Sequence, residues 1–512
     1  MANPINQTAV TNKSELGLHG IQTPIQDLDP KSPEDVLYEI LSSVLRIDLA
    51  DLDKSRSFLS LGGDSLLAIK VMGRCRTKGI TLNVIDLIEA KSLFELSQRA
   101  GLYLNKSVAE ISPIPRNNVD QNITNRLLGS ESYRVESIQP CSPIQDDFLA
   151  SQSTNPSLYQ CCFVLRFVGN VADHPVKARR LGEAWKSVVQ RHSILRTIFV
   201  DSISRPGQFE QVVLGGYEPA IEYEEGEVLT FISHSPPTFQ PSKVAHRLQL
   251  AQTSYNEVFL RLDINHALVD GQSTQCILTD LFEAYKERPN TSPALQYDEF
   301  VAHLGQMPTQ TSQTYWMKYL SNAKSTYLPM DHGHATLSGL DTLQAKLSLD
   351  YVSIQEFCGT YGVTLANVCQ LAWGLVLRSF TGLDDVVFSF ITSGRSDALE
   401  GIQDAVGPYV STMPCRIKFD GKTHVEIMLS QIAQDLFNGF EHRYAPISNK
   451  NAAIELPSAR QLGNTTMSYQ REIENAPIDS GIRFTVEKRS NPTDVSRYYC
   501  CINVFFSSLC RC

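Results

Sequence analysis

Residues 57–74 read SFLSLGGDSLLAIKVMGR, and this stretch decides the fold of the first part of the chain. A helix that begins at Ser65 would place the hydroxyl where backbone N–H groups lack partners, and the helix dipole there favours an anion. A nucleophilic serine would need a base nearby, yet no histidine lies between His19 and His174. Ser65 is therefore interpreted as a place where a group is attached. The alternative is that Asp64 and Ser65 only cap the helix.

Helices are predicted on both sides of this stretch. Ser32 is a good N-cap and Pro33 suits the first helical position. Apolar residues then repeat at helical spacing, namely Val36, Leu37, Ile40, Leu41, Val44 and Leu45. Further helices are expected at 65–76, within 84–90, and at 93–100 behind the N-cap Ser92. Together they predict a small four-helix bundle.

This region resembles the acyl or peptidyl carrier domain of nonribosomal peptide synthetases. The resemblance covers residues 31–103, and its core motif, Leu61 to Leu66, matches without a break. It implies that 4′-phosphopantetheine is the cofactor, attached covalently to Ser65. Asp64 and Gly63 then belong to the attachment site, and the glycine leaves the approach free of a side chain.

The rest of the chain is organised differently. Residues 1–30 are polar and are expected to form a flexible N-terminal segment, and 104–134 are expected to be a linker. From 135 onwards, strand-like and helix-like segments alternate. Strands are predicted at 161–169 and 257–265, and helices at 179–195 and 273–287. This is an α/β region large enough for two subdomains.

A second group of candidate site residues follows the strand predicted at 257–265. His266 falls at the end of this strand, and Asp270 and Gly271 lie in the turn before the next helix. Held by local contacts, such a histidine can accept a proton near neutral pH. Taken alone the pattern is weak, because a single histidine is more often structural and Asp-Gly is often only a turn.

Five motifs in order strengthen the signal. They are RHSILRTIF (191–199), NHALVDG (265–271), YWMKYL (315–320), SGR (393–395) and VGPYVSTMPCR (406–416). Together they resemble the successive motifs of the condensation domain of nonribosomal peptide synthetases, across about residues 135 to 496. The resemblance implies two chloramphenicol-acetyltransferase-like lobes, with a tunnel between them that is open to a carrier domain at each end.

The resemblance also implies roles for individual residues. His266 would act on the acceptor amine or position it during acyl transfer from a thioester. Asp270 would hold the loop through an arginine, for which Arg196 and Arg395 are both candidates, and Gly271 would permit the turn. An arginine in such a pair orients a site and does not react, because it stays protonated.

Two departures from the family pattern matter. Asn265 stands where the common motif has a first histidine, and a polar residue there resembles the fungal terminal, chain-releasing condensation-like domains. This resemblance favours release by intramolecular cyclisation but leaves ordinary condensation open. After residue 496 the chain reads RYYCCINVFFSSLCRC, which does not resemble the family. We therefore expect an atypical tail at 497–512, caused by an error in the gene model, and an incomplete second lobe. A metal site at the four tail cysteines is the alternative, but their spacing is not that of usual ligands.

Composition narrows the classes of function. The net charge of −10 argues against sequence-independent binding of nucleic acid, which needs a basic surface. No secretory signal and no apolar run of membrane-spanning length is found, so a cytoplasmic protein that binds no membrane is expected. No metal site is predicted. Because no adenylation domain is recognisable, the expected partners are a phosphopantetheinyl transferase, an upstream adenylation or synthetase module and, as a further candidate, a downstream carrier domain.

Two other functions compete with a carrier-plus-condensation fragment. One is a stand-alone coenzyme A-dependent acyltransferase, which would share the His-x-x-x-Asp-Gly pattern but would not need a fused carrier. The other is an inactive scaffold that only presents its carrier. Loading of Ser65 without turnover would identify the scaffold.

Overall fold

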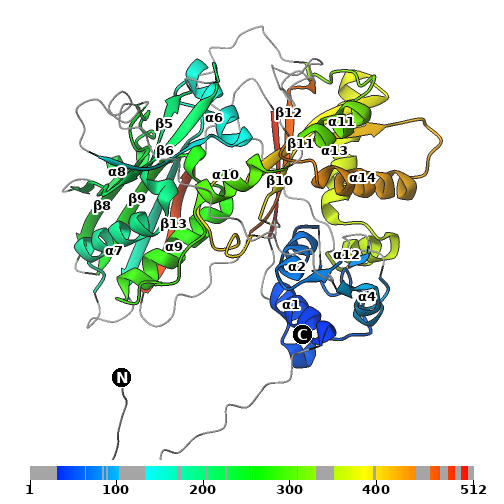
Figure 1. Cartoon of the computed structure of the whole chain (residues 1–512), viewed down its shortest axis with the longest axis horizontal. Helices are drawn as coiled ribbons and strands as arrows, with labels where there is room; N and C mark the ends of the chain where they lie inside the picture. Colours follow the sequence, from blue (N-terminus) through cyan, green and yellow to red (C-terminus); the bar gives the residue numbers. More distant parts are fainter. Residues whose placement is uncertain are drawn as a thin grey trace, which may run out of the picture.

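The computed structural model describes most of the chain from residue 32 onwards. The described residues are 32–63, 65–82, 86–87, 90–102, 133–169, 175–202, 205–224, 228–240, 242–254, 256–307, 309–329, 351–395, 399–445, 462–472, 482–490 and 498–505. They form a small helical unit and two larger α/β lobes (Figure 1). The segment 1–30, nearly all of 104–134, and the tail cysteines Cys510 and Cys512 lie outside the described residues.

The helical unit matches the predicted bundle. Its elements are α1 (Pro33–Leu45), η1 (Leu49–Asp51), α2 (Ser65–Thr77), α4 (Leu93–Arg99), and strands β1 (Ile80–Thr81) and β2 (Gly101–Leu102), which pair antiparallel. Both predicted caps are present, since the hydroxyls of Ser32 and Ser92 accept from backbone N–H groups three residues on. Of the helix expected within 84–90, residues 86, 87 and 90 are described, and of these 86 and 87 are helical.

The first lobe is built on a five-stranded sheet. The strand order is β13-β4-β9-β8-β7, and a three-stranded sheet of order β3-β6-β5 lies beside it. The bounds are β3 (Arg134–Pro140), β4 (Gln160–Gly169), β5 (Thr197–Asp201), β6 (Phe209–Gly215), β7 (Ile221–Glu224), β8 (His246–Ser254), β9 (Glu257–Asn265) and β13 (Ile482–Ser490).

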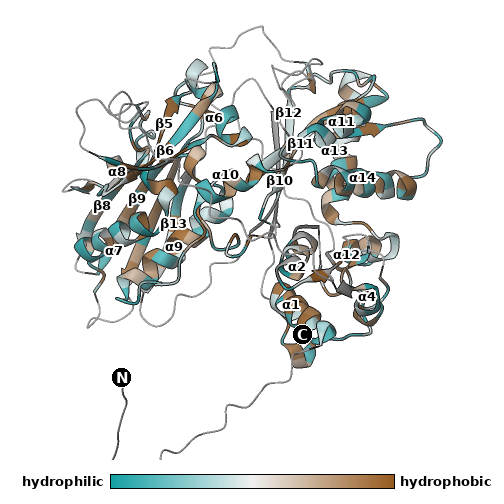
Figure 2. Cartoon of the chain, in the orientation of Figure 1, coloured by the Kyte–Doolittle hydropathy of each residue, from teal (hydrophilic) through white to brown (hydrophobic). Residues whose placement is uncertain are grey.

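Helices α7 and α9 pack on one face of the larger sheet through the main hydrophobic core (Figure 1). The helical elements of this lobe are α6 (Pro143–Thr154), α7 (Ala178–Arg191), η2 (Ser193–Arg196), α8 (Val228–Ser233), η3 (His266–Leu268), α9 (Gly271–Tyr285) and α10 (Tyr297–Gly305). The helix predicted at 179–195 ends at Arg191, and a 3-10 turn follows it. Figure 2 shows α7 with polar and apolar residues on different sides, as an amphipathic surface helix requires.

The second lobe has a four-stranded sheet of order β11-β10-β12-β14. Its elements are α11 (Thr309–Tyr319), α12 (Tyr351–Tyr361), α13 (Leu365–Thr381), β10 (Asp385–Ser393), β11 (Val410–Lys418), α14 (Val425–Phe440), β12 (Thr465–Glu472) and β14 (Tyr498–Phe505). The apolar run 368–380 lies in α13 and is buried on one side only. Leu375, Val376 and Phe380 are exposed.

The two lobes exchange chain segments. Strand β13 follows β12 of the second lobe in sequence but pairs antiparallel with β4 of the first. The connection between β10 and β11, residues 394–409, also leaves its own sheet, because Leu399, Ile402 and Tyr409 belong to the first lobe's core. Strand β14 returns to the second lobe and pairs in parallel with β12. Part of the segment predicted to be an atypical tail is thus a strand of this sheet.

No single helix among the described residues is long and apolar enough to cross a bilayer. Two consecutive helical segments, Val352–Tyr361 and Leu365–Thr381, reach that length and apolar composition only when they are taken together. The chain bends by 92° between them.

Candidate active site and carrier attachment site

His266 lies where the central strand of the first lobe ends. Strand β9 stops at Asn265, and the chain turns through η3 before α9 begins. The backbone N–H of His266 donates to the carbonyl oxygen of Tyr159 (2.8 Å), and its Nδ1 lies 2.7 Å from the carbonyl oxygen of Val269. Because a carbonyl only accepts, Nδ1 carries the proton and Nε2 keeps its lone pair.

The surroundings of His266 favour the neutral imidazole. Burial lowers the pKa of His266 below its usual value of 6.5, although the backbone hydrogen bonds and the Asp270 carboxylate oppose that shift. The ring of Phe148 lies 4.8 Å from the imidazole, centroid to centroid, and that of Tyr159 lies 6.4 Å away. The side chain is nevertheless only partly buried. A neutral imidazole with an unprotonated Nε2 can accept a proton from a molecule that reaches it.

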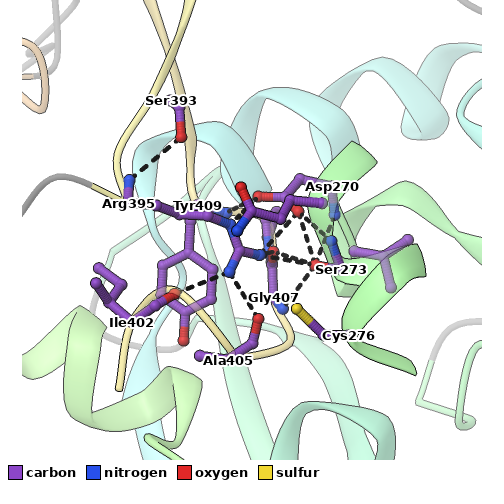
Figure 3. A network of polar contacts seen from close by, with 12 residues as sticks. Asp270, Ser273, Cys276, Ser393, Arg395, Ile402, Ala405, Gly407 and Tyr409 are labelled. Atoms are coloured by element: carbon purple, nitrogen blue, oxygen red, sulfur yellow. Dashed lines mark hydrogen bonds and ion pairs between the residues drawn. The ribbon is translucent and has the colours of Figure 1, made fainter. Parts of the chain in front are cut away.

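Asp270 is paired with Arg395 and buried with it (Figure 3). The guanidinium donates from Nη2 to Oδ1 (2.9 Å) and from Nε to Oδ2 (3.2 Å), and both side chains are almost completely buried. The carboxylate also accepts from the backbone N–H groups of Ser273 (2.7 Å) and Tyr409 (3.1 Å). Asp270 is thus the N-cap of α9 and has no free position at which to react.

Arg395 ties the second lobe to the start of α9. Its Nη1 donates to the carbonyl oxygens of Ile402 (2.9 Å) and Ala405 (2.7 Å) in the β10–β11 connection, as Figure 3 shows. The Tyr409 ring lies 4.6 Å from the guanidinium carbon. A pair in which every charge is hydrogen-bonded orients its surroundings, and this one fixes one lobe against the other.

The structure decides between the two candidate arginines. Arg196 does not contact Asp270, because its Nη1 donates to Glu136 (2.8 Å) and to the carbonyl oxygen of Leu214 (2.6 Å). These contacts join η2 to the three-stranded sheet. The prediction that Arg196 could be the partner is therefore wrong, and Arg395 takes that place.

Sequence reasoning missed Ser273 at this site. Its hydroxyl lies between the Asp270 carboxylate (2.8 Å) and both backbone groups of Gly407, with the carbonyl oxygen at 2.8 Å and the nitrogen at 3.1 Å. Asp270 and Ser273 form a capping box, whose three-residue spacing could have indicated this contact. Gly271, predicted to lie in the turn before this helix, is instead its first residue, and nothing lies within 4 Å of the place a Cβ would occupy.

Cys276 lies beside this network but is not equipped as a nucleophile. Burial raises the pKa of its thiol to about 11, so the reactive thiolate is scarce at neutral pH. Its sulfur lies 3.7 Å from the carbonyl oxygen of Gln403. Within the described part of the chain, no group of three or more His, Cys, Asp or Glu side chains is placed to hold a metal ion.

The predicted attachment site lies at the start of a helix. Ser65 is the first residue of α2, and Asp64 falls outside the described residues. Gly62 has a φ of 92°, in the left-handed region. A Cβ on Gly63 would lie 2.6 Å from the carbonyl oxygen of Phe58, so only glycine fits there. This backbone suits a phosphodiester on Ser65, because it presents a helix N-terminus without flanking side chains at the glycines.

Comparison with known proteins agrees with this geometry. A family model described as condensation domain matches residues 135–508, which is most of the chain. The chain belongs to the condensation domain family. A second model, described as phosphopantetheine attachment site, matches residues 35–100. The chain therefore carries a phosphopantetheine attachment domain ahead of its condensation domain.

The relatives are fungal synthetases of much greater length. Nonribosomal peptide synthetase inpB of Emericella nidulans is 38% identical over 491 residues, which cover 90% of this chain and 21% of that protein. Nonribosomal peptide synthetase cm3A of Cordyceps militaris is 34% identical over 504 residues, covering 93% of this chain and 10% of that one. This condensation-domain chain thus spans about a fifth or less of either relative.

Solved structures share the fold. The condensation domain from the monacolin K polyketide synthase MokA aligns with a TM-score of 0.55 at 15% identity, covering 70% of this chain and 87% of that chain. The two-lobed architecture predicted from the motifs is thereby confirmed. At this identity, the likeness carries the fold alone.

Proposed function

We propose that the chain carries an acyl or peptidyl group on Ser65 and transfers it to an amine beside His266, as a step of nonribosomal peptide biosynthesis. The observation that carries this proposal is the imidazole of His266, whose Nδ1 hydrogen bond to Val269 (2.7 Å) leaves Nε2 free to accept a proton. The attachment domain ahead of it and the fungal relatives support the same reading.

Each residue of the site has a separate task in this proposal. The amine nitrogen forms a C–N bond with the acyl carbon, the bond from that carbon to sulfur breaks, and the nitrogen loses one proton. His266 Nε2 accepts that proton and can return it to the departing sulfur. Asp270 and Arg395 do not touch the reacting atoms. They hold the His266 turn against the second lobe, which keeps the base in place.

When attached, 4′-phosphopantetheine supplies a terminal thiol that holds the acyl group as a thioester. The chain's own part is to present Ser65 at the start of α2, where the helix dipole favours the phosphate. Tethering raises the effective concentration of the acyl group at the second site.

Asn265 supports a specialised reaction. With an amide in place of a first histidine and the Asp270 carboxylate paired with Arg395, His266 is the remaining proton acceptor of the motif. We propose cyclising release as the favoured outcome, with intermolecular condensation as the alternative. A stand-alone coenzyme A-dependent acyltransferase is disfavoured by the fused attachment domain.

The partners and boundaries follow from this function. We propose a phosphopantetheinyl transferase, an upstream adenylation or synthetase module and a downstream carrier domain as partners, in the cytoplasm.

The proposed domains are 31–103 for the carrier and 135–496 for the condensation region. The matched ranges, 35–100 and 135–508, support both starts and extend the second domain past our boundary.

Loading of Ser65 tests the carrier half of the proposal. The full chain is incubated with coenzyme A and a phosphopantetheinyl transferase, and its intact mass is compared with that of Ser65→Ala. We expect the mass of one phosphopantetheine to be added to the wild type only. A folded wild type that gains nothing would leave a free acyltransferase as the better reading.

A further inference from the structure

Helix α6 turns one face toward the His266 turn. The face consists of Gln145, Phe148 and Gln152, which lie on one side of a helix because they are three and four residues apart. Gln145 Nε2 donates to the carbonyl oxygen of Ala267 (3.1 Å), and the Phe148 ring lies 4.8 Å from the imidazole of His266. One helix thus contacts the turn at successive points along its length.

The third contact is a pair of amide side chains. Gln152 Nε2 donates to Asn265 Oδ1 (3.2 Å), and Asn265 Nδ2 donates back to Gln152 Oε1 (3.0 Å). Gln152 Nε2 also donates to the carbonyl oxygen of Leu158 (3.0 Å), which fixes the orientation of its amide. Asn265 is only 4% exposed, so these bonds form where water competes little.

The amide pair is linked to the protonation site of His266 through the backbone. Asn265 Oδ1 accepts from the backbone N–H of Ala267 (2.9 Å) and so caps η3. The η3 turn in turn brings the carbonyl oxygen of Val269 to Nδ1 of His266. A loss of the cap would loosen the turn that selects which ring nitrogen carries the proton.

We propose that α6 is the positioning element for His266, and that Gln152 is a positioning residue that acts through Asn265. The inference rests on the proposed function only in taking His266 as the proton acceptor. It also assigns Asn265 a structural task. Its amide is committed to Gln152 and Ala267 and holds the turn.

The test measures the tautomer of His266 and the rate of acyl transfer separately. The full chain is labelled with ¹⁵N in its histidine rings, and the His266 signals are identified by their loss in His266→Gln. Gln152→Met removes the three hydrogen bonds but keeps the side-chain volume, and Gln431→Met on the exposed side of α14 is the matched control. Acyl transfer by the same proteins gives kcat and KM.

We expect the wild type and Gln431→Met to show a protonated Nδ1 and an unprotonated Nε2. Gln152→Met should show both tautomers and a kcat lowered about tenfold or more, with KM changed less than about twofold. Asn265→Ala should behave like Gln152→Met, and the double variant should be no worse than Asn265→Ala, because the two residues act as one unit.

Wild-type tautomer signals in a folded Gln152→Met, with kcat within about twofold of the wild type, would overturn the inference. A mixed tautomer with unchanged kcat would support the positioning role of α6 while contradicting the proposed function of His266. The positioning role of α6 and the proposed function of His266 are therefore contradicted by different results.

Discussion

The imidazole of His266 shows how a single residue is prepared for its task. Its hydrogen bond to Val269 selects the tautomer, and burial favours the neutral ring. The hydrogen bond arises from the turn that follows β9, whereas the burial arises from packing against other segments. The sequence placed the histidine at the strand end, but the pKa depends on contacts with Phe148 and Tyr159, which are more than a hundred residues distant in the chain.

The pH dependence of acyl transfer follows from that pKa. His266 must be neutral to accept a proton, so transfer should rise with pH through its pKa and then level off. Because burial lowers this pKa below 6.5, the rate should be flat from neutral pH upwards and fall only under mildly acidic conditions. A pH–rate profile of single-turnover transfer measures this. An inflection above pH 7 assigned to His266 would contradict the account.

The Asp270–Arg395 pair is the second prediction at this scale. Arg395→Lys removes the two-pronged contact and the donors to Ile402 and Ala405, and leaves the Asp270 carboxylate buried with a poorer partner. We expect a loss of about 1–3 kcal/mol in the free energy of unfolding, because buried acceptors are left without donors. Denaturant unfolding of the condensation region measures it.

Arg196→Lys is the control for that prediction, because Arg196 binds Glu136 and lies away from Asp270. It should lose less free energy of unfolding than Arg395→Lys, because its partner Glu136 is partly exposed to water. Equal losses of unfolding free energy in both lysine variants would argue against a specific role for Arg395. The sequence left these arginines undecided, since the choice depends on a pairing between lobes that no local pattern encodes.

Among the helices and strands, the sequence predicted best the features that depend only on neighbouring residues, such as helix caps and apolar spacing. The caps at Ser32 and Ser92 and the apolar spacing of the first helix each appear in the structure. Strand β9 was predicted in position, and both of its faces are buried. Its charged residues Arg261 and Asp263 are buried as an ion pair (3.0 Å). Arg261 also donates to the carbonyl oxygen of Phe231 in α8 (2.7 Å).

The turn before α2 yields a prediction for the carrier domain. Gly63→Ala would set a Cβ against the carbonyl oxygen of Phe58, so the turn and α2 must shift. Overpacking of this kind costs about 1–3 kcal/mol. Hydrogen exchange followed by mass spectrometry should show faster exchange in peptides from α1 and α2.

Gly305→Ala provides the comparison, because nothing lies within 4 Å of its added Cβ. Exchange in the carrier peptides should stay unchanged in this variant. Unaltered exchange in Gly63→Ala as well would mean that the turn before Ser65 is looser than the structure indicates.

The whole molecule depends on connections between lobes that sequence reasoning did not predict. Strand β13 crosses to the first lobe's sheet, and the β10–β11 connection packs into the first lobe's core. Both pairings join segments far apart in the chain, where periodicity carries no information about partners. The order of motifs predicted the family and the two lobes, while the site at their junction required the tertiary structure.

The most direct test of the central claim is a single turnover from the loaded chain. Ser65 is loaded from a panel of acyl-coenzyme A donors, amines are added, and the loss of the acyl mass from the intact protein is followed with the amide formed. With any donor and amine that the wild type uses, His266→Ala should load equally but transfer about a hundredfold or more slowly. Equal rates of transfer in the two proteins would contradict the account, because His266 would then not serve the reaction.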